Sequence, residues 1–232
     1  MPEMKIEMNP MFEGFTRETF EFFMAIRFNN NREFFVENEE WYRRAVRGPA
    51  VALAEELKPA IEKLDPMLET RSHKVVSRLN RDVRFSKDKS PYRDYIWIAF
   101  RRPGEERATT LGVFFDISDQ GASFGMGFYD ENKPLMNALR VRILERPEEV
   151  RKIMKTALAH FDFNPNQYKR MAIPDAVEDD LRPYYNLKGF YFSRAIEREA
   201  LMSRALVREL VDGYELLRPL YQYIMALKPM EE

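Results

Sequence analysis

The sequence predicts an α+β protein in which an antiparallel sheet packs with N-terminal, central and C-terminal helices. Three observations lead to this class. Apolar residues recur at helical spacing up to about residue 64, and short runs rich in β-branched and aromatic residues follow as far as residue 129. Helical spacing then returns and dominates the C-terminal third. Helices, then neighbouring strands, then helices fit a meander sheet better than alternating α/β units.

Three helices are expected before the sheet. Thr16 is the predicted N-cap of the first helix, and Asn29 is predicted to end it in the left-handed conformation. Asn30 and Glu33 have the spacing of a capping box that opens the second helix. The third helix is expected over about 49–64, where the apolar residues form one stripe.

The strand patterns form a meander with one late addition. They cover residues 73–81, 95–102, 109–118 and 122–129, and then 187–196. Central helices are expected over 133–145 and 148–161, separated by a break at Arg146-Pro147, and a C-terminal helix is expected over about 198–227. Residues 162–186 are polar and contain several prolines, so we expect mostly loop there.

Length and composition bound the class of protein. The 232 residues suit an N-terminal tail over residues 1–14 and a single α+β domain over 15–228. Charged residues make up 32% of the chain but the net charge is −1, so nucleic acid is not an expected partner. The chain has no cysteine and no apolar run that suits a leader or a membrane span. We therefore expect a soluble, cytoplasmic protein with no membrane attachment.

The segment 80–95, NRDVRFSKDKSPYRDY, is unusually dense in charge. Its sixteen residues hold five bases and three acids, a local surplus of two on a chain that otherwise balances. Arginine forks and lysine ammonium groups suit phosphate or carboxylate, so the segment can form an anion site. Alternatively the acids pair with the bases and the segment is a structural clamp between strands. The residues alone leave both interpretations open.

Several stretches of the chain resemble a known family. They are NNREFF (30–35), RDVRFSKDKSPY (81–92), GMGFY (125–129), LRVRI (139–143) and LKGFYFSR (187–194). In this order and spacing they resemble the bacterial and fungal family numbered 2461 among the domains of unknown function, over roughly residues 12–225. The resemblance implies a single α+β domain and implies no activity. After Tyr168 the family usually continues with a proline-x-glycine-aromatic run and an acidic-His-Pro element, whereas this chain reads on to MAIPDAVEDDLRPYYN.

We hypothesise a pocket on the sheet that binds, or binds and transforms, a small anionic ligand such as a phosphorylated or carboxylated metabolite. The expected ligand-binding residues are Asn31, Arg32, Arg81, Asp82, Arg84, Ser86, Lys87, Asp88, Lys89 and Tyr92, with Arg140 and Lys188 as outer candidates. Asp88 is the candidate general base, Tyr92 the candidate proton donor and Ser86 a weaker catalytic candidate. The alternative is a non-enzymatic structural or protein-interaction domain. Whether the protein is an enzyme, its cofactors and its oligomeric state stay open.

Other motifs favour ordinary structural roles. Ser86 and Lys89 have the spacing of a serine–lysine nucleophile, but strand-like sequence flanks them and the accompanying S-D-N and K-T-G motifs are missing. Gly125 and Gly127 lack the third glycine of a dinucleotide loop, so close strand packing is the better interpretation. The two histidines are far apart in sequence without a ligand pattern, so no metal site is expected.

Overall fold

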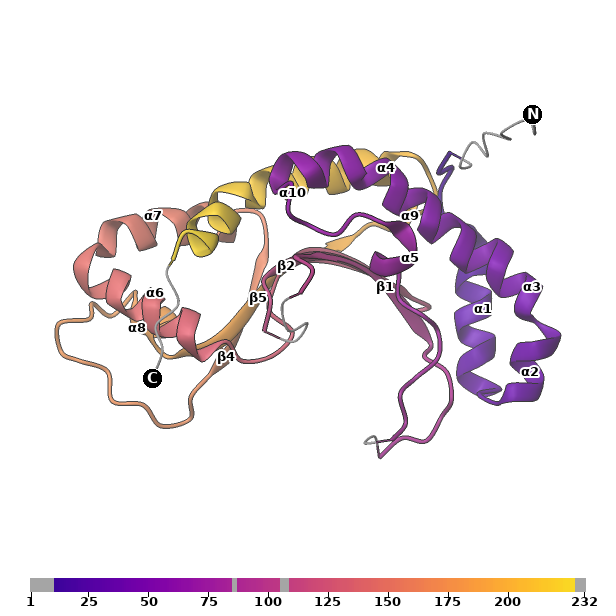
Figure 1. Ribbon diagram of the computed structural model, residues 1–232, viewed down its shortest axis with the longest axis horizontal. Coiled ribbons are helices and arrows are strands. Elements are labelled where there is room, and N and C mark those ends of the chain that lie inside the picture. The colour runs from indigo at the N-terminus through magenta and orange to yellow at the C-terminus, as the bar shows by residue number, and fades with distance from the viewer. Residues whose placement is uncertain (1–10, 85–86, 105–108, 228–232) are drawn as a thin grey trace.

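The computed structural model describes residues 11–84, 87–104 and 109–227, and it confirms the predicted α+β class (Figure 1). Within these residues, five strands form one antiparallel sheet in the order β1-β2-β3-β5-β4. The strands are β1 (Tyr95–Arg101), β2 (Gly112–Ser118), β3 (Gly121–Gly127), β4 (Asp162–Gln167) and β5 (Leu187–Ile196). The first three form the predicted meander, and the predicted late strand β5 pairs with β3.

Along the chain, helices come before, between and after the strands, as the sequence pattern predicts. Before it come α1 (Arg17–Phe28), α2 (Arg32–Glu37), α3 (Glu39–Tyr42), a π-helical turn (Arg43–Arg47), α4 (Gly48–Leu64) and α5 (Ser72–Val75). Between β3 and β5 lie α6 (Lys133–Glu145), α7 (Pro147–Leu158) and α8 (Arg182–Tyr185). The chain ends in α9 (Arg198–Leu201) and α10 (Ala205–Met225), so the single predicted C-terminal helix is divided in two.

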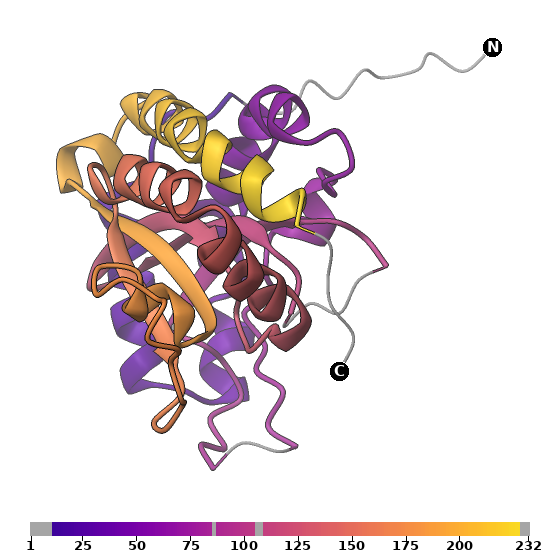
Figure 2. The same ribbon diagram turned by 90° about the vertical axis from the view of Figure 1, so that its left-hand side faces the viewer.

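The long helices α4 and α10 lie side by side over one face of the sheet (Figures 1 and 2). Side chains alternate between the two faces of a strand, and those of Ile96, Ile98 and Phe100 are fully buried on the helix side. Along β1 to β3, no helix among the described residues covers the other face (Figure 1). We call this second face the open sheet face, and its side chains are those of Tyr95, Trp97, Ala99, Phe114, Asp116, Ser123, Tyr191 and Ser193.

Aromatic rings fill the layer between the sheet and α10. Tyr214 lies edge-on to Phe124, with ring centroids 5.6 Å apart, and its hydroxyl donates to the Phe114 carbonyl oxygen at 3.0 Å. Gly213 permits this close approach, because a Cβ there would lie 2.3 Å from the Phe124 ring. A glycine inside a helix costs about 1 kcal/mol relative to alanine, so close packing explains its presence better than helix propensity does.

Close strand pairing also explains the glycines of β3. A Cβ on Gly125 would lie 1.8 Å from the carbonyl oxygen of Phe192, and one on Gly127 would lie 2.3 Å from the Cβ of Tyr191. Both contacts are with the neighbouring strand β5. The structure therefore agrees with the close-packing interpretation of the GMG stretch.

Some local predictions are wrong for identifiable reasons. Asn29 has φ −122°, so it does not adopt the left-handed conformation. The N-cap of α2 is Asn31, whose side chain accepts a hydrogen bond from the Phe34 backbone, because Asn30 is committed to a different contact. The pattern at 73–81 gives the short helix α5 and then single bridges to Ile98 and Tyr92 in place of a continuous strand.

The strand β4 was not predicted. Its sequence, DFNPNQ, is mostly polar and contains a proline, which removes a backbone donor. Proline is tolerated at the edge of a sheet, where one side of the strand needs no partner, and β4 is the edge strand beside β5. The rest of the 162–186 stretch, apart from α8, is irregular as expected.

Residues 11–14 pack onto the domain, whereas residues 1–10 of the expected tail lie outside the described residues. Phe12 is 1% exposed and contacts Phe15 edge-on at 5.3 Å. Its backbone N–H donates to Glu56, and its carbonyl oxygen accepts from Arg204. This segment therefore links α4 to the start of α10.

We expect Phe12→Ala to lower the free energy of unfolding by about 3–5 kcal/mol, because a buried ring is replaced by a cavity. Met11→Ala is the matched control, since Met11 is 62% exposed, and we expect a change within about 0.5 kcal/mol. Denaturant unfolding measures both. Equal, small effects would contradict the packing described for this segment.

Candidate functional site

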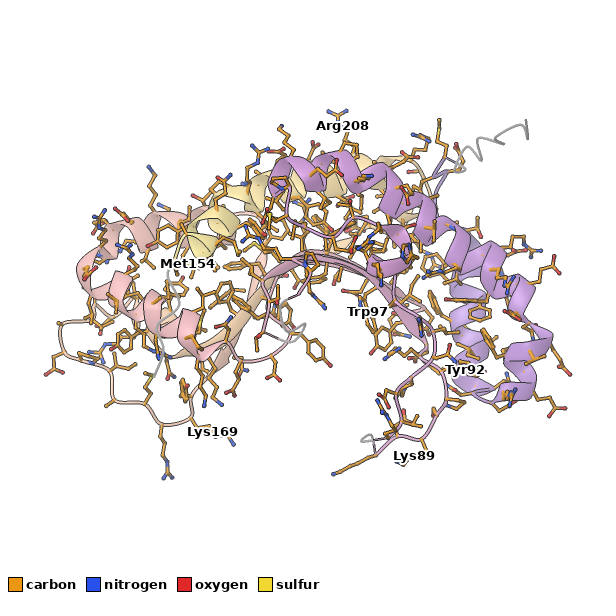
Figure 3. All side chains as sticks on the ribbon, in the orientation of Figure 1. Lys89, Tyr92, Trp97, Met154, Lys169 and Arg208 are labelled. Atoms are coloured by element: carbon orange, nitrogen blue, oxygen red, sulfur yellow. The ribbon has the colours of Figure 1, made fainter. Side chains whose placement is uncertain are left out.

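The charged segment forms an arm that projects from the β1 side of the sheet (Figure 1). Its two sides run antiparallel: Asn80 bridges Tyr92, and the Arg81 N–H donates to the Pro91 carbonyl oxygen at 2.8 Å. Figure 3 shows Tyr92 at the base of this arm and Lys89 near its distal end. We call residues 80–92 the arm; Ser86 lies outside the described residues.

A single asparagine holds the base of the arm against the N-terminal helices. The side chain of Asn30 donates to the Tyr92 carbonyl oxygen and accepts from the Tyr92 N–H, both at 3.0 Å. The Tyr92 ring is buried and stacks on Phe35 at 4.4 Å. Tyr92, a candidate proton donor from the sequence, therefore has its ring inside the core.

The charged side chains of the arm largely face one another. Arg84 donates to both carboxylate oxygens of Asp82, at 3.0 and 2.7 Å, and lowers the Asp82 pKa to about 2. Arg81 forms an ion pair with Asp88, whose pKa is lowered by hydrogen bonds from Ser90 and by Arg81. Lys89 donates to the Val83 carbonyl oxygen at 2.9 Å. The arginines of the motif thus point at its own acids.

Apart from Lys87, which is part of the arm, the remaining sequence candidates do not lie there. Asn31 caps α2, while Arg32 and Lys87 are exposed. Arg140 and Lys188 lie on α6 and β5, separated from β1 by two intervening strands (Figure 1). The structure therefore divides the proposed ligand set between two ends of the sheet.

Arg140 is buried, with 7% exposure, and forms hydrogen bonds with backbone carbonyl groups. Its guanidinium donates to the carbonyl oxygens of Tyr185 and Leu187, and it lies 5.5 Å from the Tyr168 ring centroid. Desolvation lowers the Arg140 pKa. Lys188 donates to Glu131 at 2.9 Å, which raises the Lys188 pKa. Both cations hold the connection around α8 in place.

A larger candidate site lies beside the base of the arm. It is a partly open groove of about 830 Å³ along β1 and α5. We call it the basic groove, and the residues that line it are Glu69, Arg71, His73, Lys74, Val75, Val76, Ser77, Arg78, Asn80, Asp82, Arg93, Trp97, Ala99, Arg101, Arg102, Pro103 and Gly104. Asp82 was among the sequence candidates, whereas none of the described cations that line the groove was.

Among the described residues that line the basic groove, cations outnumber acids. Six cationic side chains (Arg71, Lys74, Arg78, Arg93, Arg101 and Arg102) face two acidic ones (Glu69 and Asp82). Glu69 is paired with Arg71, which lowers the Glu69 pKa to about 2, and Arg102 is paired with Asp65. Among the described residues, Lys74 and Arg78 have no carboxylate within ion-pair distance, and both are exposed.

The floor of the groove is aromatic. Trp97 lies on the open sheet face of β1 (Figure 3), and the guanidinium of Arg93 sits 4.8 Å from its ring centroid. Arg93 also donates to the carbonyl oxygen of Arg78 at 3.1 Å, which ties the arm to the segment after α5. A sequence signal existed: Trp97 and Arg101 are four residues apart on one strand face.

Two other kinds of site are absent from the described residues. No three His, Asp or Glu side chains there come together in an arrangement that could hold a metal ion. In the same part of the chain, no helix is both long enough and apolar enough to cross a membrane.

Comparison with known proteins gives a family. The profile described as "Conserved hypothetical protein (DUF2461)" matches residues 18–223, from the first turn of α1 to the last turn of α10. The chain belongs to this family. The DUF2461 match contains the arm and the basic groove, so both features lie within the family domain. Among curated proteins, no match to this chain is found.

We expect Asn30→Ala to lower the free energy of unfolding by about 1–3 kcal/mol, because it removes both hydrogen bonds to the Tyr92 backbone. Arg84→Ala is the comparison, and we expect no measurable loss of stability, since the Arg84–Asp82 pair is exposed to solvent. Chemical denaturation of both variants checks this. A larger loss for Arg84→Ala would place the structural clamp in the arm itself.

Proposed function

We propose that the protein binds a small anionic ligand, such as a phosphorylated or carboxylated metabolite, in the basic groove. One observation carries this proposal: among the described residues, six cations and two acids line the groove, and two of these cations have no described carboxylate within ion-pair distance. The chain as a whole has a net charge of −1, so this surplus is local.

The electrostatics of the groove favour a bound anion. In the described part of the chain Lys74 and Arg78 have no carboxylate within ion-pair distance, and like charges that line one groove repel, so a bound anion would relieve repulsion there. Arginine forks match phosphate and carboxylate oxygens in two-point hydrogen bonds. A volume of about 830 Å³ lies within the range of small-molecule sites.

The arm contributes a wall to this site. Asn80 and Asp82 line the groove, and the Asp82 carboxylate, which accepts from Arg84, also interacts with the charge of Arg93. Arg93, at the foot of the arm, faces the groove above Trp97. In this proposal the internal pairs of the motif fix the shape of the wall, and the anion meets Lys74, Arg78 and Arg93.

A second candidate function is a structural or protein-interaction domain whose arm is a salt-bridge clamp. The pairs Arg81–Asp88 and Arg84–Asp82 favour it, because they leave little of the motif's charge unmatched. This candidate predicts that loss of the groove cations changes no small-molecule binding. The two candidates therefore separate in a single binding experiment.

We expect inorganic phosphate and pyrophosphate to raise the melting temperature of the wild-type protein and to bind by calorimetry. Lys74→Ala and Arg78→Ala should each weaken binding about tenfold or more, since a charged hydrogen bond contributes about 1.5–3 kcal/mol. Arg208→Ala is the matched control, because Arg208 is exposed on α10 at the opposite surface (Figure 3).

Equal loss of affinity in the Arg208→Ala control would mean that binding is non-specific. No binding of phosphate, pyrophosphate or citrate to wild type would contradict the proposal and favour the clamp. Measurement at several salt concentrations should show weaker binding as salt increases, because partly exposed charges are screened.

A further inference from the structure

An unpaired carboxyl group lies on the open sheet face, one strand beyond the basic groove. Asp116 sits opposite Trp97 of β1 on one side and opposite Ser123 of β3 on the other. Directly opposed residues in an antiparallel pair have Cα atoms about 4.5–5.5 Å apart. Trp97 lines the groove, so Asp116 lies next to the end of the groove that Trp97 forms.

The contacts of Asp116 leave it without a cation. The Ser123 hydroxyl donates to Asp116 Oδ2 at 2.8 Å. Among the described residues, no Lys, Arg or His side chain forms an ion pair with Asp116. The side chain is only partly exposed, and burial raises its pKa. A half-buried carboxyl with one donor is costly, and the fold has no evident need for its charge.

The position of Asp116 makes it accessible to a ligand of the groove. Its neighbours along β2 on the same face are Phe114 and Ser118, and no helix among the described residues covers β2 there (Figure 1). An extended ligand that has its anionic end at Lys74 and Arg78 and passes Trp97 would next meet the carboxylate and hydroxyl of Asp116 and Ser123. These two groups are acceptors that suit hydrogen-bond donors on the ligand.

We propose that the ligand is a phosphate ester of a polyol, that is, a sugar phosphate either free or as part of a nucleotide, and that its hydroxyl groups donate to Asp116 and Ser123. This inference rests on the proposed function, because it assigns the phosphate to the basic groove. A ligand hydroxyl group fits this half-buried site better than a ligand ammonium group does. Removing a neutral hydroxyl from water costs less free energy than removing a cation. An amine-bearing phosphate ester is thus the competing class.

The experiment measures binding of matched ligands by calorimetry. The probes are inorganic phosphate, ribose 5-phosphate, adenosine monophosphate, ribose and phosphoethanolamine. We expect ribose 5-phosphate to bind about tenfold or more tightly than phosphate, because hydroxyl donors add bonds to a charged acceptor. Asp116→Asn should remove this gain and leave phosphate affinity unchanged. Asp179→Asn, at a fully exposed carboxylate, is the control and should change neither.

The outcomes separate this inference from the proposed function. Phosphate binding without any gain from ribose 5-phosphate overturns the polyol class and leaves the proposed function in place. A greater gain from phosphoethanolamine than from ribose 5-phosphate also overturns it. Absence of binding by every phosphate overturns this inference, and absence of citrate binding as well overturns the proposed function. A further gain from adenosine monophosphate identifies a nucleotide as the source of the sugar phosphate, and equal affinities identify the free sugar phosphate.

The Asp116→Asn variant is expected to fold. A raised pKa in the folded state means that Asp116 contributes stability below the ordinary pKa of Asp, and that this stability is lost as the pH rises through the folded pKa. Ionised Asp116 therefore favours the fold less than a neutral group would, and a neutral amide of the same shape should be at least as stable. A variant that unfolds at pH 7 would show Asp116 to be structural and would overturn its assignment to the ligand.

Discussion

Burial of a single face of the sheet is the constraint on which the rest of this structure depends. An antiparallel sheet can bury one face and leave the other to solvent. Here α4 and α10 cover the face that carries Ile98, Phe115 and Phe124, all fully buried. Because side chains alternate between the two faces along each strand, Trp97 and Asp116 lie on the open sheet face. Both binding features proposed above follow from that alternation.

The charged motif is mainly a structural element, and one edge of it lines the proposed site. Its arginines face Asp82 and Asp88, and exposed pairs of this kind contribute little to stability. The arm is held at its base, where Asn30 satisfies the backbone of buried Tyr92. The charge-dense segment of the sequence therefore forms one wall of the groove. Lys74 and Arg78, which have no carboxylate partner among the described residues, come from the segment before the arm.

Local patterns predicted the meander and the late strand because strand alternation is visible in single stretches of sequence. The edge strand β4 was hidden, because its polar residues and proline read as loop. The groove could not be predicted as a unit, since Lys74, Arg78 and Arg101 meet only after the segment at α5 has packed beside β1. Arg140 was predicted as an outer ligand residue, and its structural role could not be read from the sequence, because its partners are backbone carbonyl groups that carry no sequence signal.

The central claim is that an anion binds at the basic groove and not within the arm. Side-chain nitrogen NMR during titration with inorganic phosphate tests it most directly, because lysine Nζ, arginine Nε and the Trp97 indole report separately. The account predicts saturable shifts at Lys74, Arg78 and Trp97 with little change at Arg84. Chemical-shift changes at Arg81 and Arg84, without changes at Lys74, Arg78 and Trp97, would contradict the claim.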